Sequence, residues 1–264
     1  MAIIPKFYIE SVVSIGVKNK SSITWIGTGF FVFRKVDTNN NAQLFLVTNK
    51  HIIENKDTLS IRMIEKTSNN LINVNVGLFE NGKPLFLLHD NPKIDIAVIP
   101  LNGGFIMQNN LQFTAFDIDE NAMSSSELLE NGFDEGSLIH MLGYPMGLVN
   151  VNSNTPICRL GCVARLDREQ IITNCNILAD IQNFPGNSGS PVVSRPELIA
   201  IDGTKSLSRS VLIGIIHSYI PYRESLINSQ TSEVVEIRSE NSGIANLHPV
   251  EFIRDIIDKV NKKI

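Results

Sequence analysis

The sequence lacks three features that would each indicate a class of protein. No stretch approaches the ~20 consecutive apolar residues that a membrane-spanning helix requires. Lysine and arginine form no long run and the net charge is −4, which argues against nucleic acid as a ligand because phosphates need clustered cations. The N-terminal residues show no basic leader followed by a long apolar segment. We therefore expect no membrane and no nucleic-acid partner, and a cytoplasmic location.

Cysteine is also scarce, with only Cys158, Cys162 and Cys175. An odd number argues against a complete disulfide framework. On a strand, Cys158 and Cys162 would lie ~13 Å apart, which is too far for a disulfide, whereas Cys175 could face either of them across a hairpin. One bridge therefore stays open, although a reducing compartment is favoured. No second cluster of Cys and His completes a ligand set, so we expect neither a metal nor a cofactor.

Short apolar runs fill most of the chain and are separated by clusters of Asn, Gly, Asp and Pro. They are rich in Val, Ile and Phe and too short for typical helices, which predicts strands. These runs are 7–17, 29–36, 44–47, 85–88 and 96–101, then one beginning at Leu138, 158–166, 171–178, 191–194 and 211–216. Asn39–Asn41 and Asn81-Gly82 are typical of hairpin turns. The pattern as a whole predicts an all-β fold.

Three segments depart from this pattern. The polar stretch 117–135 separates the two sets of strands, and Ser124 is placed to begin a short helix within it. A second polar stretch, 223–245, is predicted to be a loop. Near the C-terminus, apolar residues at 250, 253, 257 and 260 form a helical stripe, and Pro249 suits the first turn of that helix.

Three short segments carry residues that can act together in acyl transfer. His51 lies at the end of one apolar run, Asp95 opens another, and Ser188 lies in the glycine-rich turn 186–189 just before a third. A histidine can serve as base and acid near neutral pH, and an aspartate can orient it. A serine hydroxyl becomes a nucleophile once a base removes its proton. Each segment alone is a weak signal, but the three together predict a Ser-His-Asp triad.

The order and spacing of these segments resemble the chymotrypsin-like serine peptidases, most closely the stand-alone bacterial trypsin-like, glutamyl-endopeptidase and HtrA protease-domain groups. Residues 27–32 and 136–147 resemble the strands that precede the histidine and open the second barrel. The resemblance covers about residues 10–220 and implies two antiparallel β-barrels with a C-terminal helix packed on the second. The expected boundaries are 1–118 for the first barrel, 119–135 for the crossing, 136–246 for the second barrel and 247–264 for the helix.

The resemblance also implies an oxyanion hole formed by the backbone N–H groups of Gly186 and Ser188. Asn187 occupies the position of an aspartate that, in zymogen-derived members, pairs with a newly freed N-terminal amine. An asparagine has no negative charge to offer. We therefore predict that activity does not depend on liberating a new N-terminus.

Three residues are expected to bind the substrate side chain: Gln182, His217 and Tyr219. Gln182 would lie at the base of the pocket and is neutral, so nothing favours Lys or Arg in the substrate. A bulge could turn His217 into the pocket and favour Glu or Gln, since glutamyl endopeptidases and viral relatives place a histidine one residue earlier. Alternatively, Tyr219 narrows the pocket and favours small side chains. The sequence leaves both alternatives open.

The sequence therefore predicts a serine endopeptidase that hydrolyses protein or peptide substrates through an acyl-enzyme. Two alternatives remain, a catalytically silent scaffold that binds proteins and an esterase or acyl-transferase. An α/β-hydrolase is disfavoured because its triad runs serine, acid, histidine along the chain.

Overall fold

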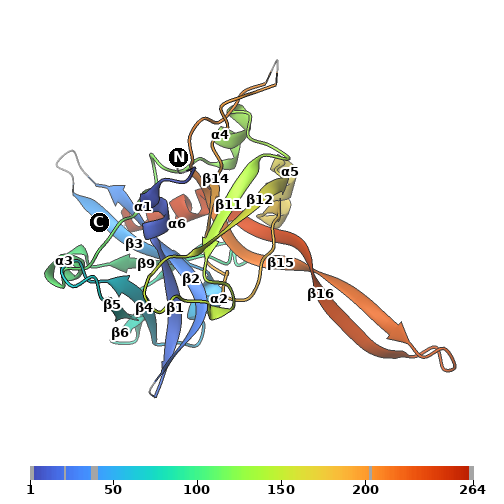
Figure 1. Cartoon of the computed structure of the whole chain (residues 1–264), viewed down its shortest axis with the longest axis horizontal. Helices are drawn as coiled ribbons and strands as arrows, with labels where there is room; N and C mark the ends of the chain where they lie inside the picture. The colour runs from blue at the N-terminus through green and yellow to red at the C-terminus, as the bar shows by residue number, and fades with distance from the viewer. Residues whose placement is uncertain (1–2, 21, 37–40, 202–203, 262–264) are drawn as a thin grey trace.

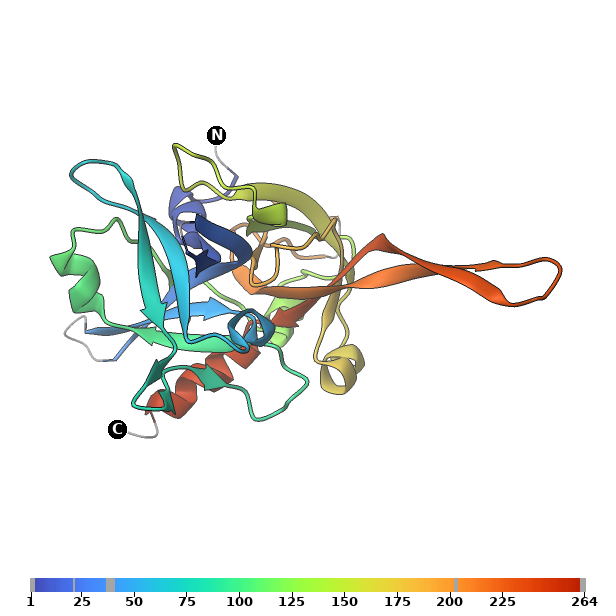
Figure 2. The same ribbon diagram turned by 90° about the horizontal axis from the view of Figure 1, so that it is seen from below.

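Two β-sheet units make up most of the chain, and a C-terminal helix packs against both (Figures 1 and 2). The computed structural model describes residues 3–20, 22–36, 41–201 and 204–261. The helices are α1 (Lys6–Glu10), α2 (Lys50–Ile53), α3 (Gly103–Gln108), α4 (Ser125–Glu130), η1 (Pro145–Gly147), α5 (Arg168–Asn174) and α6 (Glu251–Asn261). None of the helices in these ranges is long and apolar enough to cross a membrane.

The first unit is an eight-stranded sheet in the order β5-β4-β1-β2-β3-β9-β8, with β10 parallel to β2 at its side. Its strands are β1 (Val12–Asn19), β2 (Ser22–Lys35), β3 (Ala42–Thr48), β4 (Thr58–Ile64), β5 (Leu71–Gly77), β8 (Leu87–Leu88), β9 (Ala97–Leu101) and β10 (Phe116–Asp117). Within the described residues this sheet does not close on itself. Its last strand, β8, has only two residues and offers little edge for a further partner.

A separate two-stranded hairpin, β6 (Phe79–Glu80) and β7 (Lys83–Pro84), belongs to the same half of the chain. Its turn is Asn81-Gly82, and both residues have positive φ, 50° and 74°. This is the backbone of the two-residue turn that an Asn-Gly pair favours. The predicted turn is therefore confirmed, whereas the turn predicted at Asn39–Asn41 lies largely outside the described residues.

The second unit is a closed barrel in the order β11-β12-β13-β16-β15-β14. Its strands are β11 (Leu138–Gly143), β12 (Ile157–Arg165), β13 (Ile177–Asp180), β14 (Pro191–Ser194), β15 (Leu212–Ile227) and β16 (Val234–Pro249). The predicted fold class is all-β, with two antiparallel β-barrels and a C-terminal helix, and the structure confirms a mostly β architecture that ends in α6. The difference is that, in the described residues, the second unit is a closed barrel and the first is an open sheet.

Three hydrophobic clusters stabilise this arrangement. One fills the first sheet and one fills the barrel. The third lies between the units and combines Phe30 and Val47 of the first with Leu142 and Ile215 of the second, together with apolar residues of α6 such as Ile253. Each such side chain contributes ~1.5–3 kcal/mol when fully buried. Since β3, β11 and β15 share this cluster, side chains at their ends keep fixed relative positions.

The strand predicted at 171–178 is wrong in its first half. The helix α5 continues to Asn174, and β13 begins only at Ile177. The side chain of Asp167 caps α5 by accepting a hydrogen bond from the N–H of Gln170 at 2.7 Å, and Cys175 ends it with a left-handed φ of 58°. The short helix predicted in the crossing is confirmed, since α4 begins after Ser124 with a complete capping box.

The start of the C-terminal helix also differs from the prediction. Pro249 does not enter the helix, because Pro249 and His248 still pair with Gly214 and Ile215 of β15. The helix α6 begins at Glu251. The strand β16 therefore extends past the expected boundary at 246, and this extension leaves the His248 side chain fully buried.

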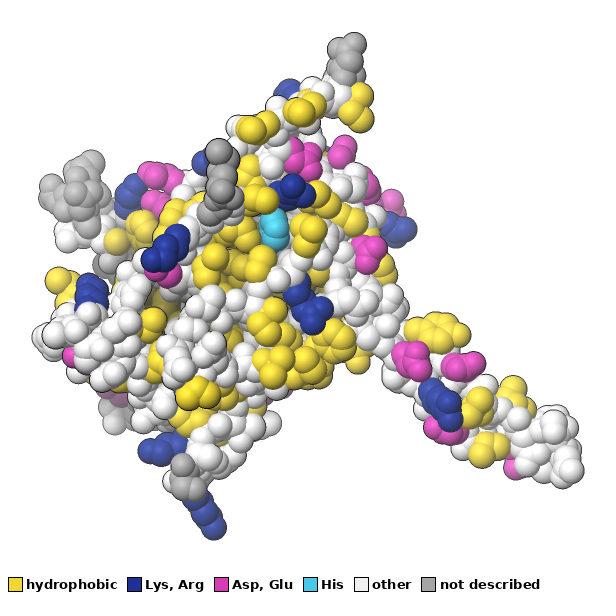
Figure 3. All heavy atoms as spheres, in the orientation of Figure 1, with side chains coloured by type: hydrophobic (Ala, Val, Ile, Leu, Met, Phe, Trp, Pro, Cys, Tyr) yellow, Lys and Arg dark blue, Asp and Glu magenta, His cyan; other side chains and the backbone are white. Residues whose placement is uncertain are grey.

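The segment predicted as the loop 223–245 is instead part of a long hairpin. Strands β15 and β16 remain paired as far as Ile227 and Val234, and their outer part projects from the body of the protein as a twisted ribbon (Figures 1 and 2). We call residues 220–241 the arm. Its apolar side chains are exposed, Tyr222 by 57% and Ile237 by 64%, and charged side chains lie among them (Figure 3). Because both faces of the arm are in water, its sequence lacks the apolar pattern that predicts a strand.

Candidate active site

His51 and Asp95 form the centre of the candidate site. His51 lies on α2, directly after β3, and Asp95 lies just before β9, which pairs with β3. The Nδ1 atom of His51 is 2.5 Å from Oδ2 of Asp95, and the backbone N–H of His51 donates to Oδ1 at 2.9 Å. Because a carboxylate only accepts, Nδ1 carries the proton, and Nε2 is left as the basic nitrogen. The pair has the geometry of a histidine base held by its orienting carboxylate.

The surroundings of Asp95 favour its charged form. Burial alone would raise the pKa of Asp95, but the hydrogen bonds and charge of His51 lower it below its ordinary value. The side chains of His51 and Asp95 are 42% and 24% exposed. Asp95 is therefore an anion near neutral pH, and it can stabilise the imidazolium that forms when His51 takes a proton.

The charge of Asp95 also predicts how stability depends on pH. Its pKa is lowered in the folded state, so the folded protein binds this proton less readily than the unfolded chain does. The contribution to stability is therefore complete above the ordinary aspartate value of about 3.9 and is lost as the pH falls through the lower folded value. In urea titrations below about pH 4, the wild type should lose stability more steeply than Asp95→Asn. Parallel pH profiles for the two proteins would contradict this.

The backbone of Asp95 is held from both units of the fold. Its carbonyl accepts from the Asn49 side chain at 2.7 Å and from the Lys50 N–H at 3.4 Å, both in the first unit. Its N–H donates to Nε2 of His248, at 2.9 Å, on β16 of the barrel. The position of the carboxylate is therefore set by groups on either side of the boundary between the units.

Ser188 lies in the turn between β13 and β14 of the barrel. Gly186 and Gly189 flank it with φ of 95° and 87°, values that favour glycine. The turn is fastened to β2 of the first unit through Thr28, which is fully buried. The Thr28 N–H donates to the Ser188 carbonyl at 2.9 Å, and the Thr28 hydroxyl donates to the Gly186 carbonyl at 2.8 Å.

The same threonine connects the serine turn to the strand that leads to the histidine. The Thr28 carbonyl accepts a hydrogen bond from the hydroxyl of Thr48 at 2.8 Å, and Thr48 is the last residue of β3, shortly before His51. The Ser188 turn thus lies next to the His51 region. Among the described residues, however, no hydrogen bond joins the Ser188 hydroxyl to His51. The structure therefore contains the His51–Asp95 pair and an adjacent serine turn, but not the hydrogen bond between Ser188 and His51 that would complete a triad.

Gly189 lies at a tight contact between the two units. A Cβ atom there would lie 2.0 Å from the Thr28 carbonyl oxygen and 2.6 Å from the Thr48 hydroxyl. We expect Gly189→Ala to destabilise the protein by about 3 kcal/mol, since both the positive φ and the clash act against it. Thermal melting of this variant beside Gly103→Ala, where a Cβ meets nothing within 4 Å, measures the effect. Equal melting temperatures for the two variants would contradict the described packing of the turn.

The predicted oxyanion donors, Gly186 and Ser188, have no acceptor within the described residues. Neither backbone N–H makes a hydrogen bond there, whereas the neighbouring Asn187 N–H donates to the Phe184 carbonyl at 3.0 Å. The Asn187 side chain is buried, and neither of its polar atoms has a partner among the described residues. The role of these N–H groups as an oxyanion hole, and the predicted independence from N-terminal processing, stay predictions.

The three residues predicted to bind the substrate side chain lie on or beside the hairpin of β15 and β16. Gln182 is exposed, and its Nε2 lies 3.4 Å from the position a Cβ would take on Gly243. Tyr219 is an exposed residue of β15. His217 lies at an irregularity in the pairing of β15 with β16, as the bulge alternative requires, and its described contacts are with Asn176 and His248. A pocket role for each of the three stays a prediction.

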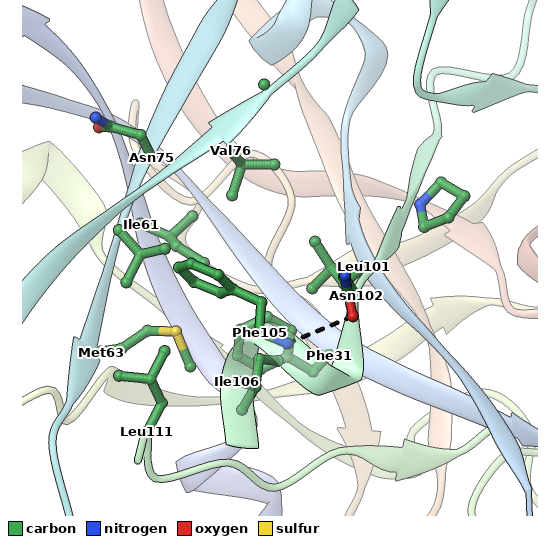
Figure 4. A pocket seen from close by; sticks show the side chains of 13 residues that line it. Phe31, Ile61, Met63, Asn75, Val76, Leu101, Asn102, Phe105, Ile106 and Leu111 are labelled. Atoms are coloured by element: carbon green, nitrogen blue, oxygen red, sulfur yellow. Dashed lines mark hydrogen bonds between the residues drawn. The ribbon is translucent and has the colours of Figure 1, made fainter. Parts of the chain in front are cut away.

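An apolar hollow in the first sheet is separate from this site. Apolar side chains such as Phe31 and Phe105 line it (Figure 4), and its polar lining side chains are Asn75 and Asn102. Asn102 is occupied as the cap of α3, where its side chain accepts from backbone N–H groups. The hollow contains none of the predicted site residues.

Thr28 and His248 hold this site together, and the sequence alone does not single out either one. Thr28 is an ordinary strand residue in the sequence, and His248 lacks the context that marks His51. Their contacts depend on how β2 meets the serine turn and how far β16 extends, which no local pattern indicates. A signal that could have indicated the strand that carries His248 is the alternation of apolar and polar residues from Ala245 to His248, which is typical of a β-strand.

Two further points concern the three cysteines and the side chains that could bind a metal. Cys158, Cys162 and Cys175 are free thiols, so the disulfide left open by the sequence is not formed. No group of three His, Cys, Asp or Glu side chains suited to a metal occurs among the residues that the structure describes.

Comparison with known proteins supports the same fold. A family model described as a trypsin-like peptidase domain matches residues 27–201. No curated protein matches this chain. Among solved structures, the chain is similar to the MamO protease domain from Magnetospirillum magneticum in its apo form, with a TM-score of 0.50 and 12% sequence identity. The match covers 95% of this chain and 97% of that one. At this identity the likeness concerns the fold alone.

Proposed function

Because this chain belongs to the trypsin-like peptidase family, we propose that it is a serine endopeptidase in which Ser188, His51 and Asp95 cleave peptide bonds. The observation that carries the proposal is the 2.5 Å contact between His51 Nδ1 and Asp95 Oδ2, made beside a glycine-flanked serine turn. A histidine held in this way presents its other nitrogen as a base. The substrate is a protein or peptide bound in extended form beside this turn.

The proposed reaction runs in two halves. His51 takes the proton of the Ser188 hydroxyl as its oxygen attacks the substrate carbonyl carbon, and the carbonyl electrons move onto the carbonyl oxygen. The N–H groups of Gly186 and Ser188 stabilise this oxyanion, where each donor typically contributes about 2.7–4 kcal/mol. Collapse breaks the C–N bond, and the imidazolium protonates the departing amine. Water then repeats the attack on the acyl-enzyme and restores Ser188.

We expect the last contact of the triad to form by a local change. The Ser188 hydroxyl is carried by a single rotatable bond on a turn that Thr28 already anchors. Rotation about this bond reorients the hydroxyl without moving the backbone. Catalytic hydrogen bonds that are long or absent without substrate commonly form in the substrate complex. The lack of a hydrogen bond between Ser188 and His51 in the described residues is therefore compatible with an active enzyme.

A fluorophosphonate probe tests the proposal directly, because it reacts with a serine that a base activates. We expect the wild-type protein to be labelled, and peptide mapping by mass spectrometry to locate the label on Ser188. Incubation with a peptide library, with cut sites identified by mass spectrometry, then defines which side chains are accepted beside the cut. The library also tests the predicted roles of Gln182, His217 and Tyr219.

A second candidate function is a scaffold that binds polypeptides without cleaving them. It is favoured by the lack of a hydrogen bond between Ser188 and His51 in the described part of the chain. Binding of a polypeptide with neither labelling nor cleavage, in a protein that melts cooperatively, would favour this alternative over the peptidase. Labelling with hydrolysis of small esters but of no peptide would instead favour an esterase or acyl-transferase.

A further inference from the structure

His248 of the second unit contacts the backbone of Asp95 and forms a cluster with His217 and Cys175. His248 is at its centre and is fully buried. The N–H of Asp95 donates to Nε2 of His248 at 2.9 Å, and Nδ1 of His248 is 2.7 Å from the Cys175 carbonyl. A backbone N–H can only donate and a carbonyl can only accept, so Nε2 is bare and Nδ1 carries the proton. These two contacts are satisfied together by a neutral ring in one tautomer.

His217 packs flat against this ring. The two imidazoles are stacked with centroids 3.9 Å apart and planes within 8° of each other. Nε2 of His217 is 2.8 Å from Oδ1 of Asn176. Burial, followed by the proximity of His248, lowers the pKa of His217 to about 3. Burial also lowers the pKa of His248, which agrees with the neutral ring that its two hydrogen bonds require.

The cluster connects the two units at Asp95, the carboxylate of the candidate site. Asp95 belongs to the first unit, whereas Cys175, His217 and His248 belong to the second, which also carries Ser188. Without His248, the N–H of Asp95 would lose its acceptor, and a donor left unpaired away from water is unfavourable. Any shift of the Asp95 backbone that relieved this cost would also move the carboxylate that meets His51.

We propose that His248 is a positioning residue, whose neutral imidazole holds the Asp95 backbone and so keeps the carboxylate in contact with His51. His217 stacks on His248 and fixes the orientation of its ring. This inference deepens the proposed function and rests on it for its catalytic consequence. The geometric consequence, the state of the His51–Asp95 contact, can be measured in a protein that cleaves nothing.

Two substitutions separate the roles of the two ring nitrogens. In His248→Gln the amide oxygen reaches the position of Nε2, so Asp95 keeps its acceptor. In His248→Asn the shorter side chain reaches only the position of Nδ1, so Asp95 loses its acceptor. Both substitutions replace a buried ring by an amide, so each variant controls for the general effect of losing the ring in the other. His140→Asn is a further control, because His140 is a buried histidine on β11 that takes part in none of these contacts.

The first measurement is the low-field NMR signal of the His51 proton shared with Asp95. We expect this signal in the wild type, His248→Gln and His140→Asn, and its loss or a clear shift in His248→Asn. The second is the rate of peptide hydrolysis, for which we expect kcat to fall ~10- to 100-fold in His248→Asn with little change in KM. Melting temperatures report general destabilisation, which should be similar in the two His248 variants.

The outcomes distinguish this inference from the proposed function. If the wild type cleaves nothing and the NMR signal still depends on the acceptor at position 248, the peptidase proposal fails and the positioning role stands. If the wild type cleaves peptides and His248→Asn matches His248→Gln in both signal and kcat, the positioning role is overturned. If both His248 variants differ from the wild type only by an equal fall in melting temperature, His248 has a structural role and the positioning role is likewise overturned.

Discussion

Replacing Ser188 by alanine is expected to lower kcat for peptide hydrolysis by about 10⁵-fold or more, because no other group of the proposed site can form the acyl-enzyme. The fold should be unchanged, since the described hydrogen bond of this residue comes from its backbone. Steady-state kinetics on a peptide from the library and circular dichroism of both proteins measure the two effects. Residual hydrolysis at ~10³–10⁴ times the uncatalysed rate would reflect the oxyanion donors and substrate binding alone.

The matched control for this variant is Ser208→Ala, which removes the hydroxyl of an exposed serine in the segment before β15. It should hydrolyse peptides at the wild-type rate and should still react with the fluorophosphonate probe. A Ser188→Ala protein that retained wild-type turnover would remove Ser188 from the mechanism altogether, whatever the other residues do.

The second large effect is expected for Asp95→Asn. An asparagine amide can donate to Nδ1 of His51, which would place the ring proton on Nε2 and leave no base facing Ser188. From the behaviour of such triads, kcat should fall by about 10⁴-fold while the fold is kept. Kinetics near pH 7 measure the loss. Turnover reduced by less than about tenfold would show that His51 does not depend on Asp95 for its tautomer.

Asp90→Asn is the control for Asp95→Asn, because Asp90 is the other aspartate of the same segment. Its side chain is 90% exposed and pairs with Lys259 at 2.7 Å. An exposed pair of this kind contributes little to stability, and Asp90 has no contact with His51 among those described. The Asp90→Asn protein should therefore match the wild type in turnover and in melting temperature.

The sequence was sufficient to predict those parts of the candidate site that are local. His51, Asp95 and Ser188 each stand beside an apolar strand, and such strands can be predicted from hydrophobicity alone. What joins the three segments is not local. The hydrogen bonds of Thr28 to the serine turn depend on how the two units pack, and packing between distant segments leaves no pattern in either of them.

The same distinction explains the errors. Residues 171–173 carry β-branched side chains typical of strands, but Asp167 caps this segment into a helix, so the local cap outweighs the strand propensity of these residues. The sequence places His217 by its distance from Gly214 along the chain. Its stacking partner, His248, is distant in sequence and is brought close by the pairing of β15 with β16.

The hairpin of β15 and β16 contains two regions of very different stability. Near Ile215 and Leu247 its strands are closed into the barrel and bury their side chains, whereas beyond Tyr219 the same two strands form a ribbon with exposed faces. An isolated ribbon of this kind is marginally stable in water. Opening of the outer pairs therefore costs little free energy and ends where the barrel begins. The arm can thus fray and reform while the Ser188 turn, which hydrogen-bonds to Ile216 of the same strand, stays in place.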